Sequence, residues 1–198
     1  MRQFSNRYII IYSAVLVTVV ALVLTVVSVS LKPLQTRNQH IEQMQMVLKA
    51  AGIEATTDEA EALYAAQITE AVTPEGLPYY TFDDGVILPL HGTGLWGPIW
   101  GYIALDREWV IVGAVFDHKG ETPGLGGEIS TDKFAQRFIG KHILDDEDRI
   151  LPPVLQKHAD PADLHHVDAI SGGTMTSNGV TEMLSHDLRQ YARLIYNL

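Results

Sequence analysis

A run of small and hydroxyl-bearing residues from Asp168 to Ser177 (Asp-Ala-Ile-Ser-Gly-Gly-Thr-Met-Thr-Ser) is the part of the chain best suited to chemistry. Its two adjacent glycines permit positive φ angles and let another molecule approach the main chain closely. Hydroxyl groups flank these glycines on Ser171, Thr174 and Thr176. With so little side-chain bulk, the run predicts an attachment site built from backbone groups and hydroxyls.

A helix is expected directly after this run. Apolar residues recur there at helical spacing, namely Val180, Met183, Leu184, Leu188, Tyr191 and Ile195. Thr176 or Ser177 is the expected N-cap, because a hydroxyl can accept a hydrogen bond from the first free backbone N–H groups. The run therefore precedes the positive end of a helix dipole, which favours a phosphate group.

The run resembles the pattern Asp-x-x-Ser/Thr-Gly-Ala-Thr of FMN-binding domains, in which a flavin transferase joins FMN through its phosphate to the final threonine. That threonine is Thr174 here, and Gly173 stands where the family usually has alanine. Two other stretches, Gly94–Tyr102 and Gly120–Gly127, are similar to signature segments of the C subunit of Na⁺-translocating NADH:quinone reductases. With the hydrophobic N-terminal segment, the resemblance spans almost the whole chain.

The resemblance implies a covalent FMN cofactor on Thr174. Ser171, Gly172, Gly173 and Thr176 would belong to the attachment loop, and the isoalloxazine ring would contact residues of the two glycine-rich stretches, namely Leu95, Trp96, Thr122 and Leu125. A flat, largely apolar ring suits aliphatic and aromatic neighbours. The chain would then relay electrons inside a Na⁺-pumping NADH:ubiquinone reductase and would not be catalytic alone.

The same resemblance implies partners and a location. The partners would be other subunits of a membrane respiratory complex, a flavin transferase for maturation, and the lipid bilayer. The location would be the bacterial inner membrane, crossed once, with the soluble domain on the periplasmic side. Two alternative functions remain open: the FMN subunit of the related ferredoxin:NAD⁺ reductase complex, and a flavin-free, membrane-anchored binding or assembly module. In the second case the glycine-rich loop would contact a partner and no flavin would be present.

Composition restricts the other functions. The 198 residues carry a formal net charge of −10 and no basic patch, which argues against nucleic acid as a partner. The absence of cysteine excludes thiolate metal sites and iron–sulfur clusters. His165 and His166 are adjacent, so they would point to opposite faces of a strand, and Asp145–Asp148 is expected to be a solvated loop. We identify no metal site and no Ser–His–Asp or paired-carboxylate constellation.

The N-terminus predicts a membrane anchor. Residues 8–31 carry no charge and are long enough to cross a hydrocarbon core of about 30 Å as a helix, after a short tail at residues 1–7. A cleavable signal peptide and a buried core helix are the alternatives. Charge does not decide the orientation, because Arg2 and Arg7 on one side are balanced by Lys32 and Arg37 on the other.

The remaining residues predict an α+β domain with a twisted antiparallel sheet and flanking helices. Pro33 is expected to end the spanning helix, a helical stalk is expected at 32–56, stopping near Gly52, and the FMN-binding domain at 57–198. Within that domain, a helix capped by Asp58 should run to Pro74, and a further helix should cover about 131–138. Strands are expected at Tyr79–Phe82, Val86–Leu90, Trp100–Leu105 and Trp109–Phe116.

Overall fold

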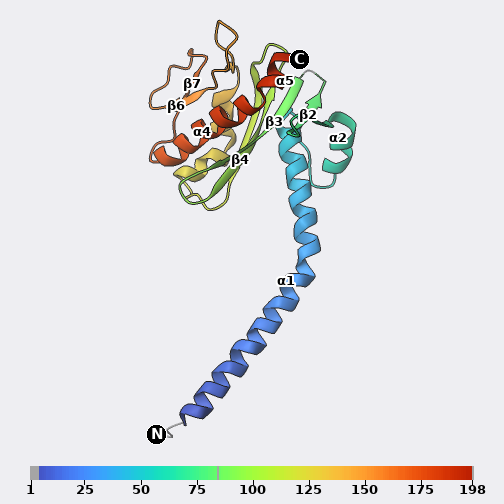
Figure 1. The fold of residues 1–198 in the computed structure, drawn as a ribbon, viewed down its shortest axis with the longest axis vertical. Helices are drawn as coiled ribbons and strands as arrows, with labels where there is room; N and C mark the ends of the chain where they lie inside the picture. Colours follow the sequence, from blue (N-terminus) through green and yellow to red (C-terminus); the bar gives the residue numbers. More distant parts are fainter. Residues whose placement is uncertain (1–4, 84, 198) are drawn as a thin grey trace. The chain divides into compact units, whose positions relative to one another are not determined.

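The structure is a computed structural model that describes residues 5–83 and 85–197 (Figure 1). Its first element is the 45-residue helix α1 (Asn6–Ala50). The chain consists of two compact units, Met1–Glu42 and Gln43–Leu198. In the first unit α1 contains an 18-residue window with a mean hydropathy of 2.8 and no buried side chains, long and apolar enough to cross a membrane. Exposure along this window disfavours the alternative of a core helix.

The prediction that Pro33 ends the spanning helix is wrong, because α1 continues through it to Ala50. Proline removes one backbone donor, but good helix formers on both sides keep the remaining hydrogen bonds of the helix. The helix stops at the predicted glycine instead. Gly52 has a φ of 79°, its N–H donates to Lys49 O, and Ile53 N–H donates to Leu48 O, the bond pattern of a Schellman cap.

The second unit contains a five-stranded antiparallel sheet in the order β1-β2-β3-β4-β5, which confirms the predicted α+β class. Its strands are β1 (Thr69–Val72), β2 (Pro78–Phe82), β3 (Gly85–Thr93), β4 (Pro98–Leu105) and β5 (Ile111–His118). The four predicted strands are β2 to β5, with bounds shifted by up to three residues. Sequential antiparallel pairing needs only short turns, and glycines lie in two of them, Gly76 between β1 and β2 and Gly94 and Gly97 between β3 and β4.

Residues 57–73 form less helix than predicted. Helix α2 covers only Ala60–Gln67, and Thr69–Val72 is strand β1, paired with β2. The capping prediction for Asp58 is also wrong: the helix follows Glu59, whose carboxylate accepts a 2.7 Å hydrogen bond from the Thr56 hydroxyl. The helical pattern along residues 57–73 does not show the pairing with β2, which forms a hairpin with the strand that follows.

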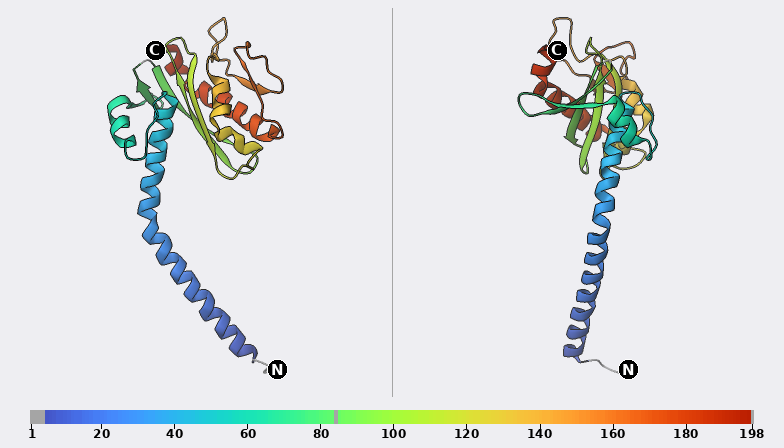
Figure 2. Two further views of the ribbon diagram at one scale, coloured as in Figure 1. Left: turned by 180° about the vertical axis from the view of Figure 1, so that it is seen from behind. Right: turned by 90° about the vertical axis from the view of Figure 1, so that its right-hand side faces the viewer.

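The sheet buries both of its faces in the second unit. On β3, Leu88 and Leu90 face one apolar core and Ile87 faces the other; on β4, Ile103 and Tyr102 alternate in the same way. The first core is covered by the C-terminal elements, and the second by α2 and the last turns of α1 (Figure 2). The compact unit therefore begins at Gln43, within the range predicted as a stalk.

The C-terminal elements cover the first face of the sheet. They comprise η1 (Gly126–Ser130), α3 (Asp132–Ala135), η2 (Gln136–Phe138), β6 (Val154–Gln156), β7 (His166–Asp168), α4 (Thr174–Gln190) and α5 (Ala192–Asn197). The predicted helix at 131–138 corresponds to α3 and η2, which are followed by Gly140 at a φ of 80°. The two-stranded parallel pair β6-β7 was not predicted, because three-residue strands carry too little pattern.

Helix α4 closes the end of β3. Beyond Ile87, β3 has no strand partner on its β2 side within the residues that the structure describes. There the buried Asp187 of α4 accepts a 2.6 Å hydrogen bond from the backbone N–H of His91. Gly179 lies so close to the Thr93 carbonyl that a side chain would collide with it. A helix thus takes the place of a neighbouring strand.

Candidate functional site

Three segments far apart in the sequence meet around one pocket of about 330 Å³. They are the β3–β4 turn, the loop after β5, and the start of α4. The pocket is lined by Leu95, Trp96, Glu121, Thr122, Leu125, Gly126, Gly172, Gly173, Thr174, Met175 and Thr176. Eight of the nine residues predicted from the sequence to bind a cofactor are in this set, and the ninth, Ser171, is exposed in the preceding turn.

Thr174 is exposed and is the first residue of α4. The helix starts three or four residues earlier than predicted, with Gly173 at the N-cap position and no side-chain cap, so neither Thr176 nor Ser177 is the N-cap. Both hydroxyls have other partners: that of Thr176 donates to Glu121, and that of Ser177 accepts from the Ile170 N–H. The free N-terminal turn therefore presents its backbone N–H groups beside the Thr174 hydroxyl.

Glycine geometry shapes the turn before Thr174. Gly172 has a φ of 75°, in the left-handed region that other residues adopt at a cost. A Cβ at Gly173 would lie 2.9 Å from Ile170 Cγ2 and 3.3 Å from Gly126 N. The local packing therefore favours glycine at the position where the resembling family usually has alanine.

Apolar side chains stand unusually exposed around the pocket. Trp96 is 69% exposed, Met175 59%, Leu95 52% and Leu125 43%. Four large apolar side chains from three segments, gathered at one hollow, are a common feature of a ligand site. Their shape and chemistry suit a flat, largely apolar ring, while the hydroxyl and N–H groups of the α4 turn suit a phosphate.

Glu121 lies at the base of the pocket and was not predicted from the sequence. Its carboxylate accepts hydrogen bonds from the Thr176 hydroxyl at 2.5 Å and from the Trp96 N–H at 2.7 Å, and only 4% of the residue is exposed. Burial alone would raise the pKa of this carboxyl, but these hydrogen bonds and the nearby His118 ring bring the pKa below its ordinary value. The signal in the sequence that could have identified Glu121 is that it is the single acidic residue of the glycine-rich stretch Gly120–Gly127.

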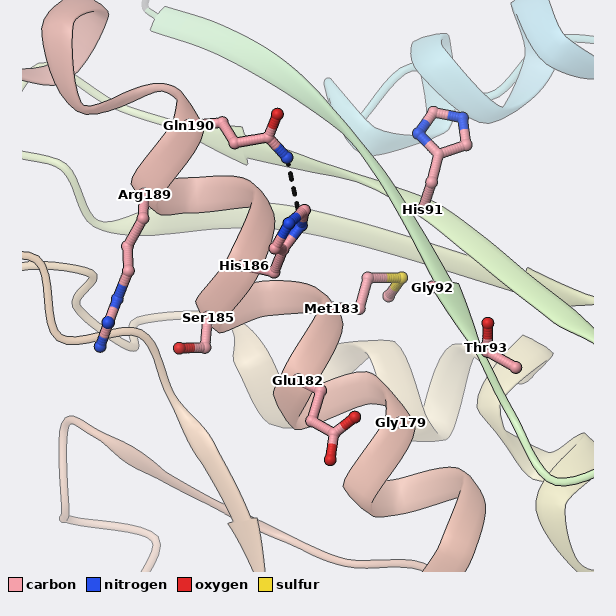
Figure 3. A pocket seen from close by; sticks show the side chains of 10 residues that line it. All are labelled: His91, Gly92, Thr93, Gly179, Glu182, Met183, Ser185, His186, Arg189 and Gln190. Carbon is pink, nitrogen blue, oxygen red and sulfur yellow. Dashed lines mark hydrogen bonds between the residues drawn. The ribbon is translucent and has the colours of Figure 1, made fainter.

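A larger cavity, of about 730 Å³, lies between the end of β3 and α4 (Figure 3). Figure 3 shows His186 hydrogen-bonded to Gln190, with Glu182 and Arg189 pointing away from each other. None of the residues predicted to bind a cofactor lines this groove. His186 and Gln190 pair with each other and with Asp187 of the same helix, and the charged side chains of Glu182 and Arg189 do not converge. We therefore place the candidate site in the smaller pocket.

Gly92, Gly94 and Gly97 have the spacing Gly-x-Gly-x-x-Gly, which also occurs in dinucleotide-binding proteins. There the glycines join a strand to a helix whose N-terminus holds the pyrophosphate. Here they join β3 to β4, two antiparallel strands. The spacing therefore does not form a dinucleotide-binding turn in this fold.

The two adjacent histidines have structural partners. The His166 ring is 2.8 Å from the Asp163 carboxylate, and the His165 ring is 3.1 Å from the Leu151 carbonyl. Asp145 accepts hydrogen bonds from Arg149 in the predicted acidic loop. Among the described residues, no group of three or more His, Asp or Glu is placed to hold a metal ion.

Comparison with known proteins gives one consistent result. Residues 94–188 match the family described as FMN-binding domain. The chain is 37% identical over 145 residues to the C subunit of the Na(+)-translocating NADH-quinone reductase of Yersinia pestis. This alignment covers 64% of this chain and 54% of that protein. It is also 42% identical over 96 residues to the protein of the same name from Neisseria meningitidis serogroup A. That alignment covers 48% of this chain and 37% of the relative. The alignments thus span about half or less of these relatives.

A solved structure covers more of the chain. The crystal structure of the C subunit of the Na(+)-translocating NADH-quinone reductase from Parabacteroides distasonis is 33% identical, with a TM-score of 0.75. The match covers 85% of this chain and 98% of that one. The match therefore extends over most of this chain.

Proposed function

Because this chain belongs to the family of C subunits of Na⁺-translocating NADH-quinone reductases, we propose that it carries FMN joined covalently to Thr174 and relays electrons as one subunit of a membrane reductase. The observation that carries this proposal is the position of Thr174. It is an exposed hydroxyl on the first turn of a 17-residue helix, beside a pocket walled by exposed apolar side chains.

The start of α4 is suited to the phosphate end of FMN. Four N–H groups at a helix N-terminus lack intrahelical partners, and the helix dipole favours a negative charge there. Attachment requires the Thr174 oxygen to lose its proton to a base and to form a bond to the flavin phosphorus. At the same time the phosphoanhydride bond of an activated flavin breaks, and its phosphate-bearing half departs as the leaving group. A threonine hydroxyl is a weak nucleophile at neutral pH, so the base and the activated flavin must come from a flavin transferase. Exposure of Thr174 makes the hydroxyl accessible to that enzyme.

The other two segments are suited to the ring. Leu95 and Trp96 extend from the β3–β4 turn, and Thr122 and Leu125 from the loop after β5, all lining the same pocket. They would fix the orientation of the ring, because a phosphoester alone leaves several rotatable bonds. When bound, FMN would supply the electron-transfer chemistry, and the protein would supply position and electrostatics.

The apolar part of α1 is the proposed membrane anchor, placing the protein in a bacterial inner membrane with its compact domain on the periplasmic side. Electrons would arrive from, and leave to, neighbouring subunits of a Na⁺-pumping NADH:ubiquinone reductase. An exposed apolar rim around the pocket is compatible with such neighbours. These partners are part of the proposal, since the curated relatives are matched over only about half their length.

The proposal is tested by coexpressing the chain with a flavin transferase. The wild-type band should fluoresce on a denaturing gel under ultraviolet light and should gain the mass of FMN less one water. Thr174→Ala should lose both signals, whereas Thr174→Ser should regain them. Thr57→Ala, which removes an exposed hydroxyl outside the pocket and outside the attachment loop, is the matched control and should stay fluorescent. A fluorescent Thr174→Ala band, or a wild-type chain without flavin, would refute the proposal.

A further inference from the structure

Glu121 is the only ionisable residue among the described residues that line the pocket. Its carboxylate touches each of the three segments that build the site. Oε1 accepts from the Trp96 N–H in the β3–β4 turn, Oε2 accepts from the Thr176 hydroxyl on α4, and Glu121 itself begins the loop that carries Leu125. One side chain therefore connects the attachment helix to both predicted ring-contact loops.

Two glycines make room for this carboxylate. A Cβ on Gly94 would lie 2.5 Å from Glu121 Oε1, and a Cβ on Gly126 would collide with both Glu121 Oε2 and the Thr176 hydroxyl. A third contact comes from His118, whose Nδ1 accepts the Glu121 N–H at 3.2 Å. The carboxylate is thus buried next to Gly94 and Gly126 and held by two hydrogen-bond donors.

The surroundings of the carboxylate also stabilise its negative charge. The carboxylate accepts one hydrogen bond from the Thr176 hydroxyl in the first turn of α4, where the helix dipole stabilises a negative charge. A buried charge interacts with its surroundings through a lower dielectric than water, so its field extends into the adjacent pocket. A group in that pocket that gains an electron would experience repulsion from it.

We propose that Glu121 is a positioning residue of the flavin site, whose carboxylate fixes the ring-contact loops against α4 and lowers the reduction potential of the flavin bound in the pocket. This inference rests on the proposed function, because it assumes that the pocket holds the ring. It assigns Glu121 no direct chemical step. The residue acts through the hydrogen bonds of Trp96 and Thr176 and through its charge.

The test is a spectroelectrochemical titration of the flavin-loaded full chain in detergent. Glu121→Gln keeps the size of the side chain and removes its charge, so the midpoint potential should shift upward while the gel fluorescence at Thr174 is retained. Glu182→Gln is the matched control, because it removes the same charge from an exposed position of α4 outside the pocket. It should leave the potential unchanged.

A second pair of variants separates charge from loosened structure. Thr176→Val removes a donor from the carboxylate and leaves its charge less neutralised, so the potential should shift downward, whereas Thr176→Ser should retain the wild-type value. Simple loosening of the loops would move Glu121→Gln and Thr176→Val in the same direction. If the Glu121→Gln protein does not accumulate, the difference in midpoint potential between Thr176→Val and Thr176→Ser still tests the role of Glu121.

The outcomes distinguish the two proposals. A wild-type chain that takes up no flavin overturns the proposed function. A flavin-loaded Glu121→Gln protein with the wild-type potential overturns the role of Glu121 and leaves the proposed function standing. A Thr176→Val protein whose potential equals that of Thr176→Ser also overturns the role of Glu121. Opposite shifts in Glu121→Gln and Thr176→Val support the inference.

Discussion

A Cβ atom on Gly172 would lie 2.7 Å from Leu125 Cδ2, so the attachment loop meets the loop after β5 at a residue without a side chain. Gly172 is also in the left-handed region, with a φ of 75°. Two separate constraints therefore act at one position: a backbone conformation that favours glycine, and contact with a residue of the predicted ring pocket.

Gly172→Ala should lower the free energy of unfolding and reduce flavin attachment. The left-handed backbone costs a non-glycine residue about 1–2 kcal/mol, and Leu125 must move to admit the methyl group. Gly76→Ala is the control, because Gly76 has a φ of 88° and nothing within 4 Å of a Cβ. Denaturant unfolding and gel fluorescence of both variants give the comparison. Equal losses would show that the Leu125 contact contributes nothing.

Leu125→Ala and Trp96→Ala should retain covalent flavin but shift its reduction potential or slow electron transfer in the assembled complex. Both side chains are exposed at the pocket, so neither supports the core. Val112→Ala, at an exposed apolar position of β5 outside the pocket, is a suitable control. If potentials and turnover match the wild type in both pocket variants, the ring lies against another surface.

The stability provided by Glu121 should depend on pH. Burial alone would raise its pKa, but the hydrogen bonds from Thr176 and Trp96 and the nearby His118 ring hold the pKa below the ordinary 4.5. A carboxyl with a lowered folded-state pKa stabilises the fold above its unfolded pKa, and this contribution is lost as the pH falls toward the folded value. Wild type should therefore exceed Glu121→Gln in unfolding free energy at pH 7, and the gap should shrink below about pH 4.5. A gap that does not change with pH would contradict this assignment.

Truncation should separate the anchor from the compact domain. Deleting residues 1–31 should yield a soluble protein that still accepts flavin, because the side chains of the apolar window of α1 are not buried in the structure. Deleting residues 1–50 should not, since Val47 and Leu48 are fully buried in the second core. Each buried side chain of this size contributes about 1.5–3 kcal/mol. Size-exclusion chromatography and thermal unfolding of the two truncations test the boundary at Gln43.

Labelling can test the proposed side of the membrane, because the chain contains no cysteine. Asp146→Cys introduces one thiol in an exposed loop, and Ser5→Cys introduces one just before α1. In intact spheroplasts, a membrane-impermeant maleimide should modify Asp146→Cys and should reach Ser5→Cys only after lysis. The reverse pattern would place the compact domain in the cytoplasm.

The parts of the fold that follow from local pattern were predictable from the sequence. Alternating β-branched and aromatic residues indicated β2 to β5, and the uncharged stretch at 8–31 indicated a spanning helix. The glycine-rich and hydroxyl-rich stretches were recognised by resemblance, and the structure places eight of their nine named residues at one pocket. Their contact roles stay predictions.

The parts that depend on contacts outside the pattern of one segment were not predictable. Strand β1 forms through its pairing with β2, which a helical pattern along residues 57–73 does not show. The same reason applies to Thr176. Its sequence position fits a helix cap, but its hydroxyl donates to Glu121, which is 55 residues away. The local sequence does not show whether the Thr176 hydroxyl bonds to backbone N–H groups of its own helix or to the distant Glu121 carboxylate.

Because α4 covers the exposed edge at the end of β3, docking of this helix and flavin attachment at its first residue should occur in a fixed order. Until α4 docks, the His91 N–H and the Thr93 carbonyl form an open strand edge that can pair with another chain and seed aggregation. During synthesis α4 emerges after the whole five-stranded sheet, so this edge is the last part of the sheet to be protected. Because Thr174 begins the same helix, a transferase that recognises the docked start of α4 would modify only chains whose sheet edge is already closed.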